Sequence, residues 1–204
     1  MPDIKLFELG PTRSARCRWT LLEAGLTYES VGNAIEVFSD PALKEVHPLG
    51  KLPAVLIDGR PLFESAAIAT AIADLVPERN LIARPGTWGR ALHDQWVCFT
   101  LSELECYVSS SEINTIDFVI PESEHVPGII AQNQKMFRQN VAVLGQVLAQ
   151  QDYLVENRFT VTDIIVGYTL NWAEEQGLVQ DKENIMAYME RLFAREFCTL
   201  VRHH

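Results

Sequence analysis

The stretch GKLPAVLIDGRPLFESAAIA, residues 50–69, decides the fold of this 204-residue chain. An apolar run over 52–57 leads into an Asp-Gly pair at 58–59, a dipeptide typical of two-residue hairpin turns, and a second extended run follows at 61–63. From Ser65 to Leu75, alanine and isoleucine recur at helical spacing. The stretch therefore predicts an antiparallel hairpin followed directly by a helix.

The residues before this stretch alternate between strand and helix patterns. Residues 3–9 are rich in strand formers and end at a Gly-Pro pair, which stops a strand. An apolar stripe over 14–24 predicts a helix, and Gly25 is placed to be its left-handed C′ residue. Residues 26–31 are predicted to form a second strand. Residues 39–46 have a polar start and an early proline, which predict a short helix.

Two domains follow from this pattern. The order β-α-β-α-β-β-α fills residues 1–80, and the polar, turn-rich segment around 77–87 has the composition of a linker. Residues 87–204 read as helical throughout. The helix over 88–108 is apolar on more than one side, so it is expected to be central in the second domain.

The start of one later helix is marked by a capping box. Thr160 can cap the helix, and Asp163, three residues on, can accept a hydrogen bond from the backbone N–H of Thr160. The helix that follows, 164–176, is predicted to be buried.

Charge and composition exclude several classes of protein. The chain has 27 acidic against 17 basic residues and a formal charge of −10, and the basic residues do not cluster, which disfavours nucleic-acid binding. No apolar run reaches the length of a membrane span, and the N-terminus lacks the layout of a secretory signal. We therefore expect a cytoplasmic protein that acts neither on membranes nor on nucleic acids.

The cysteines and histidines predict neither disulfides nor a metal site. No Cys-x-x-Cys pair occurs among the four cysteines, so they read as reduced thiols. The internal histidines are far apart, and the remaining two sit together at the end of the chain. These residues are Cys17, Cys98, Cys106 and Cys198, and His47, His93, His125, His203 and His204.

Four local patterns together resemble the glutathione transferases over nearly the whole chain. They are PTRSAR at 11–16, GKLPAV at 50–55, LFESAAI at 62–68 and the capping box at 160–163. The resemblance implies a thioredoxin-like α/β domain that binds glutathione, followed by an all-α domain, in a cytosolic homodimer. It implies the conjugation of glutathione, as co-substrate, to a small electrophile without a metal.

The resemblance also assigns the glutathione site. A cis Leu52–Pro53 bond would turn the N–H and C=O of Leu52 toward an extended peptide. Ser65, at a helix start, suits the γ-glutamyl carboxylate and can at the same time be an N-cap, and Glu64 would face the α-amino group. Lys51 would reach the glycyl carboxylate or a nearby backbone oxygen of the ligand, or else it is a solvated surface lysine.

Two hydroxyls are candidates for activating the thiol. Conjugation needs the glutathione thiolate, and a hydroxyl that donates to sulfur near a helix N-terminus would favour it. Related proteins place Tyr, Ser or Cys after the first strand, whereas this turn offers Thr12 and Ser14. Alignment on Arg16 puts the usual serine at Thr12, while Ser14 is the better N-cap. Cys17, inside the helix, reads as a buried structural cysteine.

Two other functions are also compatible with the sequence. The unusual Thr12 is compatible with a non-catalytic interaction module of the same fold. A glutathione-dependent reductase or dehalogenase is a third hypothesis. The electrophile would bind between the domains, where the first helix of the second domain could supply Trp96, Phe99, Cys106 or Tyr107.

Overall fold

The computed structural model describes residues 1–117 and 119–202, so Phe118, His203 and His204 lie outside the described residues. The strands are β1 (Ile4–Glu8), β2 (Glu29–Gly32), β3 (Ala54–Ile57) and β4 (Arg60–Phe63). The helices are α1 (Ser14–Ala24), α2 (Pro41–Val46), α3 (Ser65–Asp74), α4 (Trp88–Thr100), α5 (Cys106–Ile113), α6 (Gly128–Asn140), α7 (Ala142–Leu148), α8 (Val161–Glu175) and α9 (Glu183–Phe193). A π-helical turn, Leu101–Glu105, joins α4 to α5.

The sheet has the strand order β2-β1-β3-β4, with β1 and β2 parallel and the other pairs antiparallel. Leu6 lies opposite Val55 and both enter the core shared with α1 and α3, whereas Phe7 and Ala54, one residue along, pack toward Leu43 of α2. This alternation follows from the two-residue period of a strand. Helices therefore cover both faces, which confirms the predicted β-α-β-α-β-β-α order of a thioredoxin-like domain.

The second strand begins later than the sequence predicts. Gly25 is left-handed at φ 67°, as expected, and the N–H of Leu26 donates to Leu21 O at 3.1 Å. That bond is the closing bond of a helix C-terminus, so Leu26 takes part in the cap that follows α1, and strand pairing starts only at Glu29.

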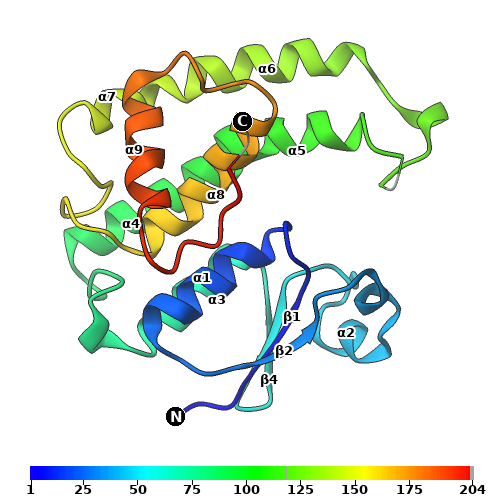
Figure 1. Ribbon diagram of the computed structural model, residues 1–204, viewed down its shortest axis with the longest axis vertical. Coiled ribbons are helices and arrows are strands. Elements are labelled where there is room, and N and C mark those ends of the chain that lie inside the picture. The colour runs from blue at the N-terminus through cyan, green and yellow to red at the C-terminus, as the bar shows by residue number, and fades with distance from the viewer. Residues whose placement is uncertain (118, 203–204) are drawn as a thin grey trace.

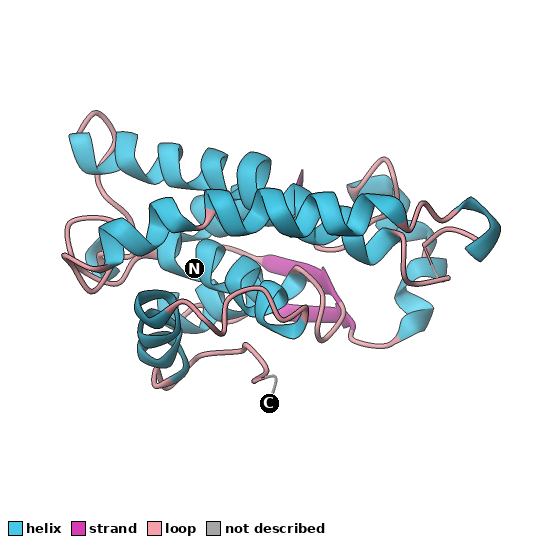
Figure 2. Ribbon diagram, turned by 90° about the horizontal axis from the view of Figure 1, so that it is seen from above, coloured by secondary structure: helices cyan, strands magenta, loops and turns pink. Residues whose placement is uncertain are grey.

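The helical half lies on the side of the sheet that carries α1 and α3 (Figure 1). Seen from above, its helices extend well beyond the small sheet (Figure 2). The most enclosed helix is α8, because Val161 and Ile165 pack into the core of the sheet domain while Val166 and Leu170 pack into the helical core. Trp19 of α1 reaches into the helical core in return.

The expectation of a central helix over 88–108 is met only in part. One side of α4 faces solvent, with Asp94, Gln95 and Cys98 exposed, and the central place belongs to α8. No helix in the described part of the chain combines the length and the apolar character that crossing a bilayer requires.

The start of α8 carries the capping box. The Asp163 carboxylate accepts from the Thr160 N–H at 2.8 Å and also from Leu154 N–H at 3.1 Å and Tyr188 Oη–H at 2.9 Å. Burial raises the pKa of Asp163 to about 6, although the hydrogen bonds from Leu154 and Thr160 act in the opposite direction. The cap therefore ties α8 to the preceding loop and to α9.

Candidate active site

Three segments that carry predicted site residues meet at one edge of the sheet. Phe7 of β1 lies opposite Ala54 of β3, which in turn lies opposite Phe63 of β4. Because β3 runs antiparallel to both neighbours, its beginning lies beside the ends of β1 and β4. The β1–α1 turn, the residues before β3 and the residues after β4 are therefore neighbours.

Within the described part of the chain, the segment before β3 carries an unpaired backbone N–H and an unpaired backbone C=O, both of Leu52. The Leu52–Pro53 bond is cis, as predicted. Among the described residues, neither the N–H nor the C=O of Leu52 forms a hydrogen bond. Pro53 is buried and Lys51 is exposed beside it. An extended ligand could pair with both backbone groups of Leu52, as an added strand would.

The segment after β4 combines a left-handed residue with a helix start. Glu64 has φ 73° and ψ 109°, a conformation that costs a non-glycine residue about 1–3 kcal/mol and that clusters at ligand-binding sites. Ser65 is the first residue of α3 and is buried, and its hydroxyl accepts from Arg16 Nη1 at 3.1 Å. Because Arg16 donates to the oxygen of the Ser65 hydroxyl, the hydroxyl proton is available to a carboxylate at the positive end of α3.

The β1–α1 turn holds Thr12 and Ser14 in one hydrogen-bonded ring with Leu9. The Leu9 N–H donates to Ser14 Oγ at 3.3 Å, Thr12 Oγ1 donates to Leu9 O at 2.8 Å, and the two hydroxyls are 2.9 Å apart. Each hydroxyl has one proton, so Ser14 must donate to Thr12. Ser14 is fully buried and Thr12 is half-buried, which makes Thr12 the hydroxyl that an incoming sulfur can approach.

Behind the site, a buried ion pair joins the two domains. Arg16 is fully buried, and its Nη2 donates to Glu105, to Thr169 Oγ1 at 2.7 Å and to Ile165 O at 2.9 Å. A buried charge is tolerated only when it is paired and hydrogen-bonded, and Arg16 meets both conditions. The guanidinium that contacts Ser65 is thus anchored to the helical domain.

Glu105 also holds the other end of the site. Arg13 Nε donates to Glu105 Oε1 at 2.5 Å, and Arg13 follows Thr12 directly. Burial would raise the pKa of the Glu105 carboxyl, but the Arg16 and Arg13 guanidiniums outweigh burial and lower the pKa from its ordinary 4.5 to about 2. Glu105 therefore stays ionised at neutral pH and connects the turn of Thr12 with the start of α3.

Sequence reasoning missed Glu105 because its position depends on the π-helical turn. An α-helix continued regularly from α4 would turn its side chains by about 100° per residue, whereas the wider turn over Leu101–Glu105 resets that direction. Nothing in the local sequence marks such a turn. The arginines of α1 were the available signal, since buried arginines require acidic partners.

Cys17 is a structural residue of α1. Its side chain is fully buried, and burial raises the pKa of the Cys17 thiol far above its ordinary range. A thiol that remains protonated and enclosed is a poor nucleophile. In the described part of the chain, no three His, Cys, Asp or Glu side chains converge as metal ligands would.

The helical domain approaches the Thr12 turn through α8. Tyr168 Oη donates to Pro11 O at 3.4 Å, and the Trp172 ring lies 4.7 Å from the Arg13 guanidinium. Trp96, one of the residues expected beside an electrophile, is instead buried in the helical core. The aromatic side chains that flank the turn are thus Tyr168 and Trp172.

Two sequence families match this chain. Residues 2–74 match the family described as glutathione S-transferase, N-terminal domain, and residues 126–196 match the glutathione S-transferase, C-terminal domain. Glutathione S-transferase GstA of Escherichia coli O157:H7 is 28% identical over 179 residues, which are 87% of this chain and 82% of that protein.

Solved structures show the same arrangement of both domains. The ternary complex of BphK, a bacterial glutathione S-transferase, superposes with a TM-score of 0.84 at 25% identity, covering 95% of each chain. A sphingomonad glutathione S-transferase complexed with glutathione superposes with a TM-score of 0.82 at 25% identity, covering 95% of this chain and 94% of that one.

Proposed function

This chain belongs to the glutathione S-transferase family, and we propose that it transfers the thiolate of glutathione to a small electrophile. The observation that carries the proposal is the unpaired backbone of Leu52 beside the buried hydroxyl of Ser65. The sphingomonad relative, whose structure contains glutathione, supports the same ligand in this fold.

In the proposed complex, glutathione lies along the edge of the sheet. Its cysteinyl residue pairs with the N–H and C=O of Leu52, and its γ-glutamyl carboxylate accepts from Ser65 at the start of α3. Glu64 faces the α-amino group, and Lys51 faces the glycyl carboxylate. The sulfur then lies next to the β1–α1 turn.

The chemistry requires a thiolate in that position. The thiol proton leaves to solvent, the sulfur forms a bond to the electrophilic carbon, and the leaving group departs with its electron pair. Thr12 stabilises the thiolate by rotating its hydroxyl proton from Leu9 O to the sulfur, after which Leu9 O loses one partner. Arg13 adds positive charge nearby, although Glu105 balances it.

Retention on immobilised glutathione and turnover of 1-chloro-2,4-dinitrobenzene test this function. We expect elution by free glutathione and a rate that depends on both substrates. Absence of binding at millimolar glutathione would contradict the proposal. Analysis of the products separates conjugation from the reduction or dehalogenation of the same substrate.

A non-catalytic role of the same fold is the second candidate. It is favoured by the closed ring of Leu9, Thr12 and Ser14, in which every hydroxyl proton already has an acceptor. Glutathione binding without turnover of any aryl halide or epoxide, together with a stable co-purifying protein, would support this role over catalysis.

A homodimer in the cytoplasm completes the proposal. The family resemblance supports pairing of two copies about a two-fold axis. Sedimentation equilibrium should give about twice the mass of one chain, and a concentration-independent monomer would contradict it. The unpaired thiols, two of them exposed, are compatible with a reducing compartment.

A further inference from the structure

His47 is a buried histidine that the proposed chemistry does not use. It directly follows α2, its N–H donates to Leu43 O at 2.7 Å, and only 5% of its surface is exposed. Pro48 comes next, and His47 has the extended conformation that a residue before proline prefers, with φ −122° and ψ 112°. The chain therefore leaves α2 at His47 and turns from there toward Leu52.

The imidazole of His47 closes the turn that leads to Leu52. Its Nδ1 accepts from the Leu49 N–H at 3.1 Å, and the His47 C=O accepts from the Gly50 N–H at 2.8 Å. Because an amide N–H can only donate, Nδ1 is the acceptor and the imidazole proton lies on Nε2. An Asn or Asp side chain fixes a turn in the same way, by accepting from the N–H two residues later.

The same ring contacts the other wall of the glutathione site. The ring centroids of His47 and Phe63 are 4.7 Å apart, within the range of aromatic pairs. Phe63 is the last residue of β4 and stands directly before Glu64 and Ser65. This contact holds the imidazole in place, and it ties the turn before β3 to the segment after β4.

We propose that His47 is a positioning residue of the glutathione site, which fixes the backbone of Leu52 relative to the start of α3. The inference rests on the proposed function, because it takes glutathione as the ligand that spans Leu52 and Ser65. A ligand that contacts two segments needs both in place at once, and a site that is formed for only part of the time binds more weakly in proportion. His47 acts through the Leu49 N–H and through Phe63.

Two substitutions separate the acceptor from the ring. His47→Phe keeps an aromatic ring against Phe63 and removes the acceptor for the Leu49 N–H. His47→Asn removes the ring, but its Oδ1 can accept from the same N–H. Recovery of glutathione binding in the Asn variant therefore reports the acceptor itself.

Calorimetric titration with glutathione and steady-state kinetics with 1-chloro-2,4-dinitrobenzene measure the effect. We expect His47→Phe to raise the Kd and the KM for glutathione by about two- to tenfold, the range that one hydrogen bond gives. The kcat at saturating glutathione should not change, because Thr12 lies on a different segment. His47→Asn should restore at least part of the affinity.

Hydrogen exchange in the absence of glutathione tests the positioning itself. By mass spectrometry, the segment 49–52 should exchange faster in His47→Phe than in the unsubstituted protein, whereas His47→Asn should stay close to the unsubstituted protein. If the unsubstituted protein does not bind glutathione, the proposed function is contradicted, and the exchange comparison then decides the positioning alone.

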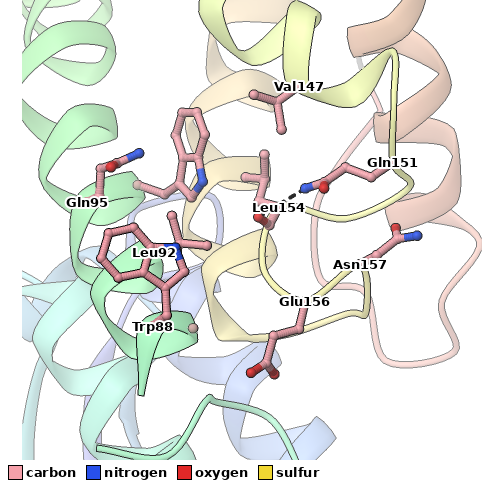
Figure 3. A pocket seen from close by; sticks show the side chains of 10 residues that line it. Trp88, Leu92, Gln95, Val147, Gln151, Leu154, Glu156 and Asn157 are labelled. Carbon is pink, nitrogen blue, oxygen red and sulfur yellow. Dashed lines mark hydrogen bonds between the residues drawn. The ribbon is translucent and has the colours of Figure 1, made fainter. Parts of the chain in front are cut away.

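Two control substitutions lie in the helical domain. His125→Phe changes the same residue type in the loop before α6. Gln95→Ala removes an exposed amide from a cleft of about 710 Å³ between α4 and the loop 149–160 (Figure 3). Both should leave the glutathione Kd and the exchange of the segment 49–52 unchanged.

Three outcomes would overturn the proposal. The first is an unchanged glutathione Kd and unchanged exchange in His47→Phe. The second is a kcat that falls as much as the KM rises, which would indicate a general structural role. The third is an Asn variant that binds glutathione as weakly as the Phe variant does.

Discussion

Thr12 and Ser14 share one ring of hydrogen bonds but differ in burial, and on this difference we propose different roles for them. Ser14 is buried, and its Oγ accepts a hydrogen bond from the Leu9 N–H, so the hydroxyl stabilises the turn. Thr12 is half-buried and must exchange Leu9 O for sulfur to take part in chemistry. The sequence offers these two residues as candidates, and the proposed choice of Thr12 rests on its burial, which depends on the three-dimensional placement of the turn.

Removing the Thr12 hydroxyl is expected to impair activation of the thiol. Thr12→Val keeps the side-chain shape, and we expect turnover of 1-chloro-2,4-dinitrobenzene at neutral pH to fall by about ten- to a hundredfold, since a hydrogen bond to a charged group contributes about 1.5–3 kcal/mol. The pKa of the bound glutathione thiol, followed by thiolate absorbance, should rise in parallel.

Ser14→Ala is the matched control. It removes an acceptor for the buried Leu9 N–H, so we expect a loss of about 1 kcal/mol in unfolding free energy with little change in the thiol pKa. A thiol pKa that responds to Ser14→Ala and not to Thr12→Val would reverse the two roles.

Glu105 is expected to make the unfolding free energy depend on pH in the acid range. Its carboxyl has a pKa of about 2 in the folded protein against an ordinary 4.5, so its contribution is complete above about pH 4.5 and is lost as the pH falls toward 2. Glu105→Gln should remove this part of the pH dependence and lower the unfolding free energy at neutral pH by about 3–5 kcal/mol, since Arg16 is left buried and unpaired.

Urea unfolding at several pH values measures this effect. Glu103→Gln, an exposed carboxylate on the same π-helical turn, serves as the control and should behave as the unsubstituted protein. An acid dependence that persists unchanged in Glu105→Gln would show that other carboxylates produce it.

Among the helices, α8 packs into the cores of both domains and so joins them. Its capping box spans only Thr160 to Asp163 and could be recognised from the sequence because both partners are local. The contacts along its length were not predictable in the same way, since Ile165 and Arg16 are far apart in the chain. Helix starts were therefore predicted better than the π-helical turn or the first residue of β2.

A substitution in the N-terminal cap of α8 is expected to lower the unfolding free energy more than a substitution in an ordinary helix cap. Asp163→Asn replaces one carboxylate oxygen with an amide donor, although Leu154, Thr160 and Tyr188 all donate toward this side chain. We expect a loss of about 2–3 kcal/mol in unfolding free energy, measured above the pKa of Asp163.

The α2 cap provides the comparison. Within the described residues, the Asp40 carboxylate accepts a hydrogen bond from the Ala42 N–H alone, at 2.9 Å. Asn is an equivalent N-cap, so Asp40→Asn should change the unfolding free energy by less than about 0.5 kcal/mol. Equal losses of unfolding free energy in Asp163→Asn and Asp40→Asn would contradict the role assigned to the buried hydrogen bonds of Asp163.

At the scale of the whole molecule, the two domains complete each other's cores. Val161 and Ile165 of α8 pack among residues of the sheet domain, and Trp19 of α1 packs among the helices. The domain limits 1–80 and 87–204 follow from the sequence and remain a prediction. The extent of the shared core depends on long-range packing, which local patterns do not encode.

A fragment of residues 1–80 tests how far the first domain is autonomous. Without Val161 and Ile165 its α1–α3 surface would be exposed, and Arg16 would lose its Glu105 partner. We expect the fragment to lack a cooperative thermal transition by circular dichroism. Cooperative unfolding with the midpoint of the full chain would contradict this interdependence.

A crystal structure with bound glutathione would show whether Leu52, Ser65 and Thr12 contact the tripeptide as proposed. We expect the cysteinyl backbone to pair with Leu52, the γ-glutamyl carboxylate to lie on Ser65, and Thr12 Oγ1 to lie within about 3.5 Å of the sulfur. A sulfur that neither Thr12 nor Ser14 approaches, in an otherwise occupied site, would contradict the hydroxyl mechanism.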